Sequence, residues 1–202
     1  LPELFGRRCV APVLLDVARL HPDLRLDLVF ERRFADLADE SIDLGIRIGD
    51  PPDNGDVVAK RLGQQRLMLC ASPAYLDRAG VPGNPADLSD HACLVQGGAG
   101  EPGWLFLDDA GSARRHPVRA RHAFSALDMV ADAACAGLGI AQLPGWLLRD
   151  QIADGRLVSV LEDHQQPRLP INVLWLRSRS MSPRLRVTID ALVAASPAWA
   201  MD

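Results

Sequence analysis

The stretch RLMLCA, residues 66–71, is the part of the sequence that decides the fold. A short run with apolar residues at both alternating positions is typical of a β-strand that is covered on both faces. A second run of the same kind, INVLWL, occupies residues 171–176. Because helix and strand patterns lie on either side of both runs, we expect them to be hinge strands that join two lobes of one α/β domain.

The segment before this first run alternates between helix and strand patterns. Apolar residues recur at helical spacing over Phe5–Leu20, and Pro12 predicts either a helix start or a kink there. Leu24–Phe30 and Leu44–Ile48 alternate apolar and other residues as strands do, with a short helix expected at 34–41. This order is typical of a parallel sheet with crossover helices.

The segment after Ser72 consists of short elements between loops rich in glycine and proline. Trp104–Leu107 and Arg114–Arg119 flank a turn sequence and predict a hairpin. A helix is expected after Ser125, closed by Gly137, after which strand and helix patterns return. The further expected strands are 140–143, 158–161 and 171–176, and the further helices are 146–152 and one from 183. The predicted subdomain I comprises residues 1–70 and 177–202, and subdomain II comprises residues 71–176.

The composition argues against a nucleic-acid groove in this stretch. The chain of 202 residues has a net charge of −4, and its arginines are scattered among acidic residues. A nucleic-acid surface needs clustered positive charge to displace the counterions of the phosphates. The four cysteines lie far apart without a Cys-x-x-Cys pair, which favours reduced thiols and a cytoplasmic protein. No apolar run is long enough to span a bilayer, and no signal-peptide pattern occurs, so we expect no membrane association.

Residues suited to catalysis or metal binding are not grouped in any motif. There is no Gly-x-Ser-x-Gly elbow, and no histidine lies in a catalytic motif, which disfavours an enzyme without excluding one. Asp50, Asp53 and Asp56 are spaced three apart, unlike the alternating ligands of a calcium loop. Gly97–Gly100 lacks the Lys-Ser/Thr of a phosphate-binding loop. We therefore expect no catalytic residues, no metal and no cofactor.

Three residues are candidates for contacts with a ligand. Ser125 precedes an expected helix, where it can cap the first turn and also present a hydroxyl beside free N–H groups to an anion. Arg32 and Arg47 follow or lie in expected strands, where an arginine can clamp a carboxylate through two parallel N–H bonds. The alternative for these arginines is a surface ion pair with Asp36 or Asp43.

Four strings, taken in order, resemble the effector-binding domain of LysR-type bacterial transcriptional regulators. They are FGRR at 5–8, IDLGIRIG at 42–49, LCASPAYL at 69–76 and AGLGIA at 136–141. The resemblance covers nearly the whole chain. It implies an α/β fold of two Rossmann-like subdomains joined by hinge strands, like the type 2 periplasmic binding proteins.

The resemblance also implies how such a protein works. A small-molecule inducer would bind between the two subdomains and change the geometry of a homodimer or tetramer. DNA would be bound only through an N-terminal winged helix-turn-helix domain, which is absent from this sequence. The first strand of the family fold would likewise precede residue 1.

The family resemblance implies ligand contacts from several segments. These are the loop before the first helix, the ends of two strands, a loop of the second subdomain and the start of a helix. The residues at those places are Glu3, Leu4, Glu31, Arg32, Gly49, Asp50, Gln96, Gly97, Gly98 and Ser125. Small aromatic or aliphatic carboxylates are the implied ligands, whereas Leu4, where members with FGRR often carry a hydroxyl residue, favours a more apolar one.

Two other classes of protein remain open. An extracytoplasmic solute-binding protein would have the same fold, and a signal peptide in place of an upstream DNA-binding region would identify it. An enzyme built on this scaffold would show product formation where a sensor shows only binding.

Overall fold

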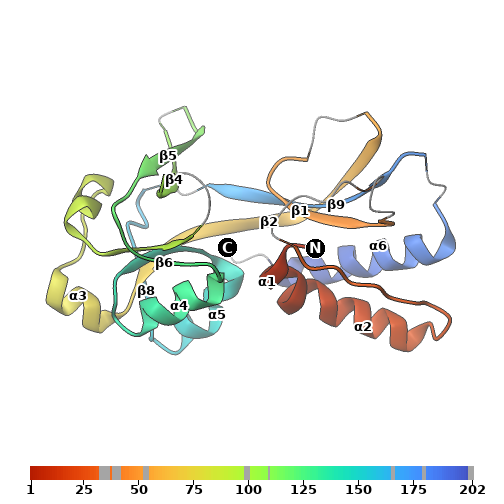
Figure 1. The fold of residues 1–202 in the computed structure, drawn as a ribbon, viewed down its shortest axis with the longest axis horizontal. Helices are drawn as coiled ribbons and strands as arrows, with labels where there is room; N and C mark the ends of the chain where they lie inside the picture. The colour runs from red at the N-terminus through yellow and green to blue at the C-terminus, as the bar shows by residue number, and fades with distance from the viewer. Residues whose placement is uncertain are drawn as a thin grey trace. The chain divides into compact units, whose positions relative to one another are not determined.

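The computed structural model describes residues 1–31, 37, 42–51, 55–97, 101–108, 110–164, 167–178 and 181–199. The chain divides into two compact units: unit 1 comprises Leu1–Gln65 and Leu169–Ala200, and unit 2 consists mainly of Arg66–Arg168. The chain passes between the units in strands β2 (Val57–Ala71) and β9 (Arg168–Leu176) (Figure 1). The boundaries predicted from the sequence, after residues 70 and 176, differ from this division: residues 66–70 belong to unit 2 and residues 169–176 to unit 1.

Unit 1 begins with a helix that changes its winding before Pro12. It consists of α1 (Glu3–Phe5), a π-helical turn (Gly6–Val10) and α2 (Ala11–Leu20). Proline has no backbone N–H and cannot continue the α-helical bonding pattern, and single π-turns are a common way to absorb such an interruption. The expected helix is confirmed, and its irregularity lies where Pro12 predicted one.

The sheet of unit 1 pairs β1 (Gly45–Ile48) with β9 in antiparallel fashion. The C-terminal helix α6 (Pro183–Ala195) and a 3₁₀ turn (Ser196–Trp199) follow, and α6 contacts α2. The ring of Phe5 meets that of Trp199 edge to face, with the centroids 5.4 Å apart. The core is formed by buried apolar side chains of these elements: Phe5, Val10, Leu14, Val17, Ile46, Ile171, Val173, Leu174, Leu185, Ile189, Leu192 and Trp199.

The strand expected at Leu24–Phe30 does not form, so this prediction was wrong. Nearby, the structure has only an isolated parallel bridge, Pro2 with Glu31, where the N–H of Glu31 donates to the Leu1 carbonyl at 2.9 Å. Side-chain exposure still alternates along the segment. An alternating exposure of side chains shows that one face of the segment is covered. A β-strand also needs a neighbouring strand that hydrogen-bonds its backbone groups in a ladder. The short helix expected at 34–41 lies outside the described residues, except for Leu37.

The sheet of unit 2 is mixed. β2 pairs antiparallel with β7 (Ile140–Pro144) and with β8 (Val158–Val160). β3 (Cys93–Gln96) pairs in parallel with β7 and with β6 (Ala120–Phe124). The parallel sheet expected from the elements before residue 66 is therefore wrong, since β1 and β2 form antiparallel pairs. The parallel pairs are those of β3. Periodicity identifies a strand but does not encode the direction of its partner, which comes from far along the chain.

The helices of unit 2 are α3 (Pro73–Ala79), α4 (Leu127–Cys135) and α5 (Gly145–Ala153), with a 3₁₀ turn η2 (Pro85–Asp90). The hairpin of β4 (Gly103–Leu107) and β5 (Ala113–Pro117) is confirmed, as is the end of α4 at Gly137, whose φ of +77° favours glycine. The core comprises buried side chains of strands, helices and hairpin: Leu69, Ala71, Tyr75, Leu76, Leu88, Cys93, Val95, Trp104, Phe106, Ile140, Val160 and Leu161.

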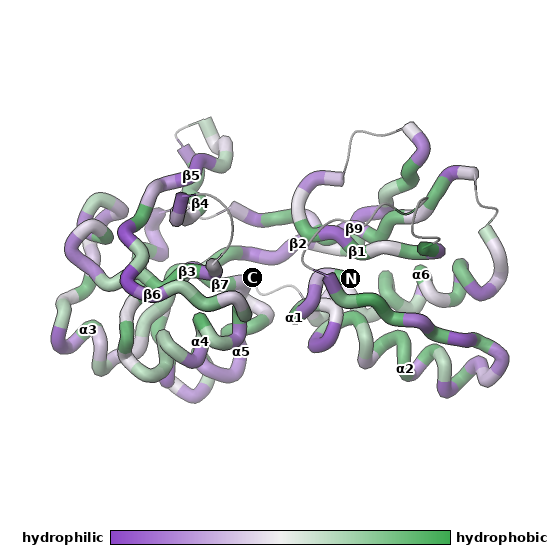
Figure 2. The backbone as a smooth tube through the Cα atoms, viewed as in Figure 1, coloured by the Kyte–Doolittle hydropathy of each residue, from purple (hydrophilic) through white to green (hydrophobic). Residues whose placement is uncertain are grey.

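The hydropathy of the residues in helix α2 agrees with the way the helix packs. Hydrophobic and hydrophilic residues alternate along helix α2, which has one face on the core and one in solvent (Figure 2). No helix among the described residues combines the length and the hydropathy that crossing a bilayer requires.

Candidate functional site

The expected ligand contacts of unit 2 meet at the carboxyl ends of two parallel strands. Gln96 ends β3 and is paired with Phe124, which ends β6. The Gly97 N–H donates to the Phe124 carbonyl at 2.7 Å, and the Gln96 side-chain amide donates to the Ser125 carbonyl at 3.3 Å. In open α/β sheets, ligands bind outside the carboxyl ends of strands. The structure thus brings Gln96, Gly97 and Ser125 together, while Gly98 lies outside the described residues.

Ser125 does not cap helix α4, contrary to the prediction. The N-cap residue is Ala126, and no side chain accepts a hydrogen bond from the first turn as a cap. Asp128 does lie in the first turn, as predicted, and its carboxylate accepts the N–H of Met129 at 3.0 Å. The exposed Ser125 hydroxyl therefore stands beside a helix start without an N-cap side chain, where the Asp128 carboxylate already accepts the N–H of Met129.

A half-buried side-chain amide in β7, that of Gln142, holds the hairpin onto this part of unit 2. Gln142 in β7 accepts the Leu105 N–H at 2.9 Å and donates to the Leu105 carbonyl at 2.7 Å. Leu105 follows Trp104, which is 4% exposed. The hairpin β4–β5 forms its own two-stranded sheet, so these two bonds link that sheet to the main one.

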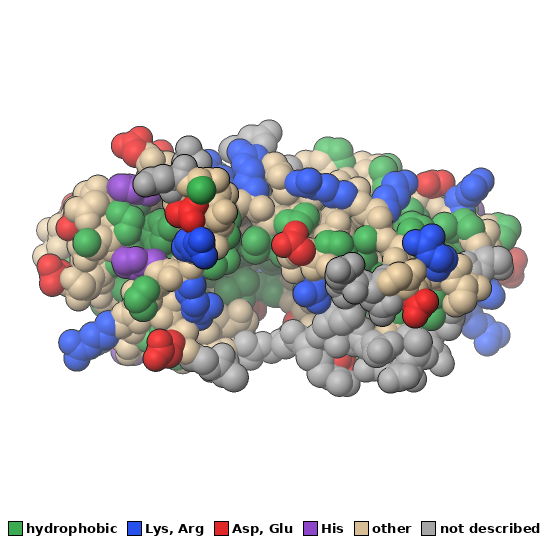
Figure 3. Space-filling model, turned by 90° about the horizontal axis from the view of Figure 1, so that it is seen from above, with side chains coloured by type: hydrophobic (Ala, Val, Ile, Leu, Met, Phe, Trp, Pro, Cys, Tyr) green, Lys and Arg blue, Asp and Glu red, His purple; other side chains and the backbone are tan. Residues whose placement is uncertain are grey.

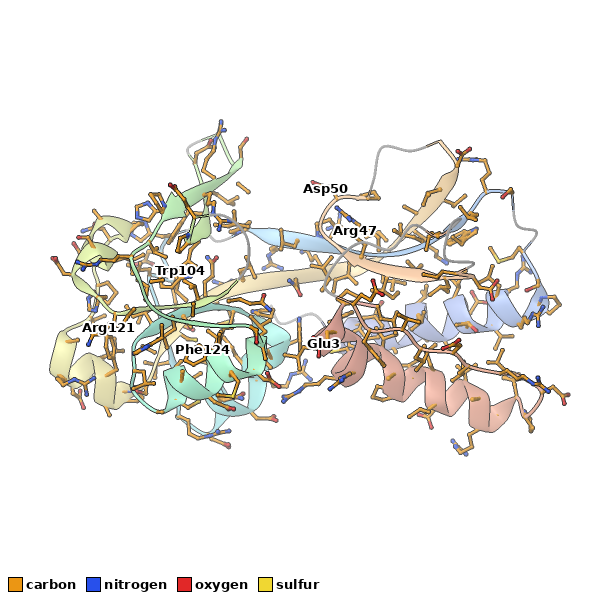
Figure 4. The ribbon with its side chains drawn as sticks, in the orientation of Figure 1. Glu3, Arg47, Asp50, Trp104, Arg121 and Phe124 are labelled. Carbon is orange, nitrogen blue, oxygen red and sulfur yellow. The ribbon has the colours of Figure 1, made fainter. Side chains whose placement is uncertain are left out.

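The expected contacts of unit 1 include a turn at the end of β1. Gly49 has a φ of +99°, donates its N–H to Pro170 at 2.9 Å and accepts the side-chain amide of Asn172 at 3.0 Å. The Arg47 guanidinium donates to the Asp50 carbonyl at 2.6 Å, and Figure 4 shows both residues at this turn. Arg47 therefore helps to shape the turn, and the Asp50 side chain is exposed.

The other expected contacts of unit 1 lie near the first residues. Glu3 is exposed on α1, 3.9 Å from Arg7 as a surface ion pair, and Leu4 is half-buried. The bridge between Pro2 and Glu31 places Glu31 beside this start of the helix. Arg32 lies outside the described residues.

Sequence reasoning missed two residues that position these segments, Gln142 and Asn172. Each is a side-chain amide flanked by apolar residues in its strand, and each binds backbone atoms of a neighbouring segment. A polar residue inside such a run was the available signal, because a buried amide needs hydrogen-bond partners.

The buried thiols among the described residues are poor nucleophiles. Burial raises the pKa of the Cys70 thiol to about 12 and that of Cys93 to about 11, so both are protonated at neutral pH. The described residues contain no group of three or more His, Cys, Asp or Glu side chains able to hold a metal. Acidic and basic side chains both occur on each unit in the face shown in Figure 3.

Comparison with known proteins gives concordant results. Residues 1–197 match the model of the family described as LysR substrate binding domain. The chain is 33% identical over 192 residues to the HTH-type transcriptional regulator DmlR of Escherichia coli K12, covering 93% of this chain and 61% of DmlR. It is 30% identical to CrgA of Neisseria meningitidis serogroup C, covering 91% and 61% of the two chains. The chain thus spans about three fifths of the length of these relatives.

Solved structures agree with this grouping. The regulatory domain of AphB in Vibrio vulnificus superposes with a TM-score of 0.82 at 27% identity, covering 96% of this chain and 95% of that one. CrgA, a LysR-type regulator from Neisseria meningitidis, gives a TM-score of 0.83 at 25% identity, covering 96% and 66%. The expected α/β fold of two subdomains like those of periplasmic binding proteins is confirmed, and the chain belongs to the LysR substrate-binding domain family.

Proposed function

We propose that this chain is the effector-sensing part of a LysR-type transcriptional regulator whose DNA-binding region precedes Leu1 in the full protein. The observation that carries the proposal is the family match over residues 1–197. The relatives are named as HTH-type transcriptional regulators, and the chain corresponds to about three fifths of their length. The full regulator acts on DNA, so we place it in the cytoplasm as a homodimer or tetramer.

The effector is a small molecule that contacts the edge made by Gln96, Gly97 and Ser125. A carboxylate suits this edge, because the Ser125 hydroxyl and the uncapped start of α4 offer hydrogen-bond donors to an anion. Leu4 favours a ligand that is apolar apart from its carboxylate group. Contacts from the other predicted residues, namely Glu3, Glu31, Arg32, Gly49, Asp50 and Gly98, belong to the same proposal.

In this proposal, binding of the effector shifts the equilibrium between two conformational arrangements of the protein. An effector changes such an equilibrium only by the difference in its affinity for the two arrangements. The chain therefore binds the effector without converting it. No solute transport and no catalysis enter this proposal.

The experiment is calorimetric titration of the chain with a panel of aromatic and aliphatic monocarboxylates. We expect one class to bind, and we expect Ser125→Ala to weaken that binding about tenfold or more, as loss of one hydrogen bond to a charged group does. Ser112→Ala, an exposed serine in the hairpin turn of the same unit, is the matched control and retains full affinity.

Three outcomes count against the proposal. Binding that Ser125→Ala and Ser112→Ala leave equally intact removes Ser125 from the site. Formation of a product from a bound carboxylate identifies an enzyme. Failure of the full-length protein to bind DNA, measured by mobility shift, refutes the regulator itself.

A further inference from the structure

A pocket of about 650 Å³ lies wholly within unit 2, away from the predicted effector contacts. Its walls come from α3, the end of η2, the start of β6 and the turn after α4. The side chains that matter below are Tyr75, Arg78, His91, Arg119, Arg121 and His122. None of the pocket's lining residues is among the predicted effector contacts.

Positive charge dominates this pocket although the chain as a whole is negative. Arg78, Arg119 and Arg121 line it, against the single carboxylate of Asp90. Arg119 immediately precedes β6 and Arg121 is its second residue, and both side chains line the pocket. Both are exposed, and in the part of the chain that the structure describes neither has an ion pair or hydrogen bond.

The third arginine is held in place. The Arg78 guanidinium donates to the Gly137 carbonyl at 2.9 Å and lies over the ring of Tyr75, 5.5 Å from its centroid. An arginine that is already ordered loses less side-chain entropy when it binds an anion. Arg78 is therefore a prearranged donor at one wall of the pocket.

Tyr75 joins this wall to His91. The Tyr75 side chain is 4% exposed, and its hydroxyl accepts the Ala92 N–H at 2.9 Å. The same hydroxyl lies 3.1 Å from Nδ1 of His91, and which of the two groups donates depends on the tautomer of the ring. This hydrogen bond ties the imidazole to the wall that carries Arg78.

We propose that this pocket is a second ligand site, which binds a small anion carrying two negative charges, such as a phosphate ester or a dicarboxylate. Guanidinium groups match the oxygen geometry of carboxylates and phosphates, and two negative charges balance three arginines and one aspartate. The volume lies within the range of about 300–1,000 Å³ that small-molecule sites occupy. Figure 4 shows Arg121 on β6 at the end of unit 2, away from Phe124 and the effector edge.

The test is calorimetric titration at low ionic strength with inorganic phosphate, succinate and acetate. We expect phosphate or succinate to bind and acetate to bind at least tenfold more weakly. The double variant Arg119→Gln/Arg121→Gln reduces affinity for the dianion at least tenfold. The matched control Arg184→Gln/Arg186→Gln removes the same charge from the exposed side of α6 in unit 1 and leaves affinity unchanged.

The two dianions distinguish the source of the ligand: binding of phosphate alone indicates a phosphate ester, and binding of succinate alone indicates a dicarboxylate. The proposal is overturned when neither binds, or when both double variants lose affinity equally. It is also overturned when the Arg119/Arg121 variant changes only the oligomeric state in light scattering, because the arginines then serve a protein partner. Ser125→Ala leaves dianion binding intact, so this test is independent of the effector site.

Discussion

The side-chain amide of Gln142 in β7 is hydrogen-bonded at both ends to the backbone of Leu105 in β4. Its oxygen accepts the Leu105 N–H at 2.9 Å and its nitrogen donates to the Leu105 carbonyl at 2.7 Å. The side-chain amide thus makes the pair of hydrogen bonds that a backbone amide makes in a ladder. It connects two sheets that have no backbone ladder between them. The hairpin β4–β5 owes its position in unit 2 partly to this single side chain.

Replacing Gln142 by leucine therefore destabilises unit 2. The leucine keeps the volume but leaves the Leu105 N–H and carbonyl without their partner, which costs about 1–3 kcal/mol. Urea unfolding monitored by tryptophan fluorescence measures the loss. Gln151→Leu is the control, since the side-chain oxygen of Gln151 is buried without a hydrogen bond among the described residues. We expect that change to be neutral or stabilising, because it removes a buried oxygen that has no partner, and an equal loss in both variants contradicts the role of Gln142.

Gly49 is needed for its backbone conformation and not for space. A Cβ at Gly49 would meet no atom within 4 Å, but the φ of +99° is strained for any residue with a side chain. Gly49→Ala is expected to lower the free energy of unfolding by about 1–3 kcal/mol. Gly55→Ala has the same open space without the positive φ and should be neutral or slightly stabilising. The melting temperatures of the two variants, measured by thermal unfolding, test this prediction. Equal melting temperatures would show that the positive φ of Gly49 does not matter for stability.

Three serines before helices should respond differently to alanine. Ser72 accepts the Tyr75 N–H and Ser182 accepts the Leu185 N–H, each at 3.3 Å, whereas Ser125 caps nothing. We expect Ser72→Ala and Ser182→Ala to cost about 0.5–2 kcal/mol of stability. Ser125→Ala should stay within about 0.5 kcal/mol of the parent protein. Chemical denaturation of all three measures this, and a large loss for Ser125→Ala would mean that the serine supports α4 after all.

Because two thiols are buried, we expect the free energy of unfolding to fall at alkaline pH. Burial raises the pKa of Cys70 to about 12 and of Cys93 to about 11, above the value near 9.0 of an exposed thiol. Above about pH 9 the unfolded chain loses thiol protons that the folded chain keeps, so the free energy of unfolding falls as pH rises. Cys70 alone contributes up to about 1.4 kcal/mol per pH unit until its folded pKa is reached.

Urea unfolding at a series of pH values from neutral to about pH 11 checks this prediction. The double variant Cys70→Ala/Cys93→Ala should show a shallower decline than the parent, whatever its stability at neutral pH. An unchanged slope would show that other groups govern the alkaline transition.

Part of the candidate site was predictable. Ser125 was named from its place before an expected helix, which forms, whereas Gln96 and Gly97 were named from the family resemblance alone, because the strand patterns did not predict β3 or β6. Their contact depends on the pairing of β3 with β6, which joins residues 29 positions apart. Arg32 and Gly98 lie outside the described residues, so their placement stays a prediction. Gln142 and Asn172 escaped prediction because the carbonyls and N–H groups they bind are distant in sequence.

The sequence by itself indicated helices α2, α4, α5 and α6, the hairpin β4–β5, the apolar runs in β2 and β9, and the glycine that follows α4. Side-chain periodicity and backbone preferences are local properties, and they act over a few residues. Only the tertiary structure decided that β2 runs antiparallel to β7, that Leu24–Phe30 lacks a ladder and that Ala126 begins α4 without a cap. Those features depend on which backbone groups meet across the fold, and the meeting of Gln142 with Leu105 is the clearest case.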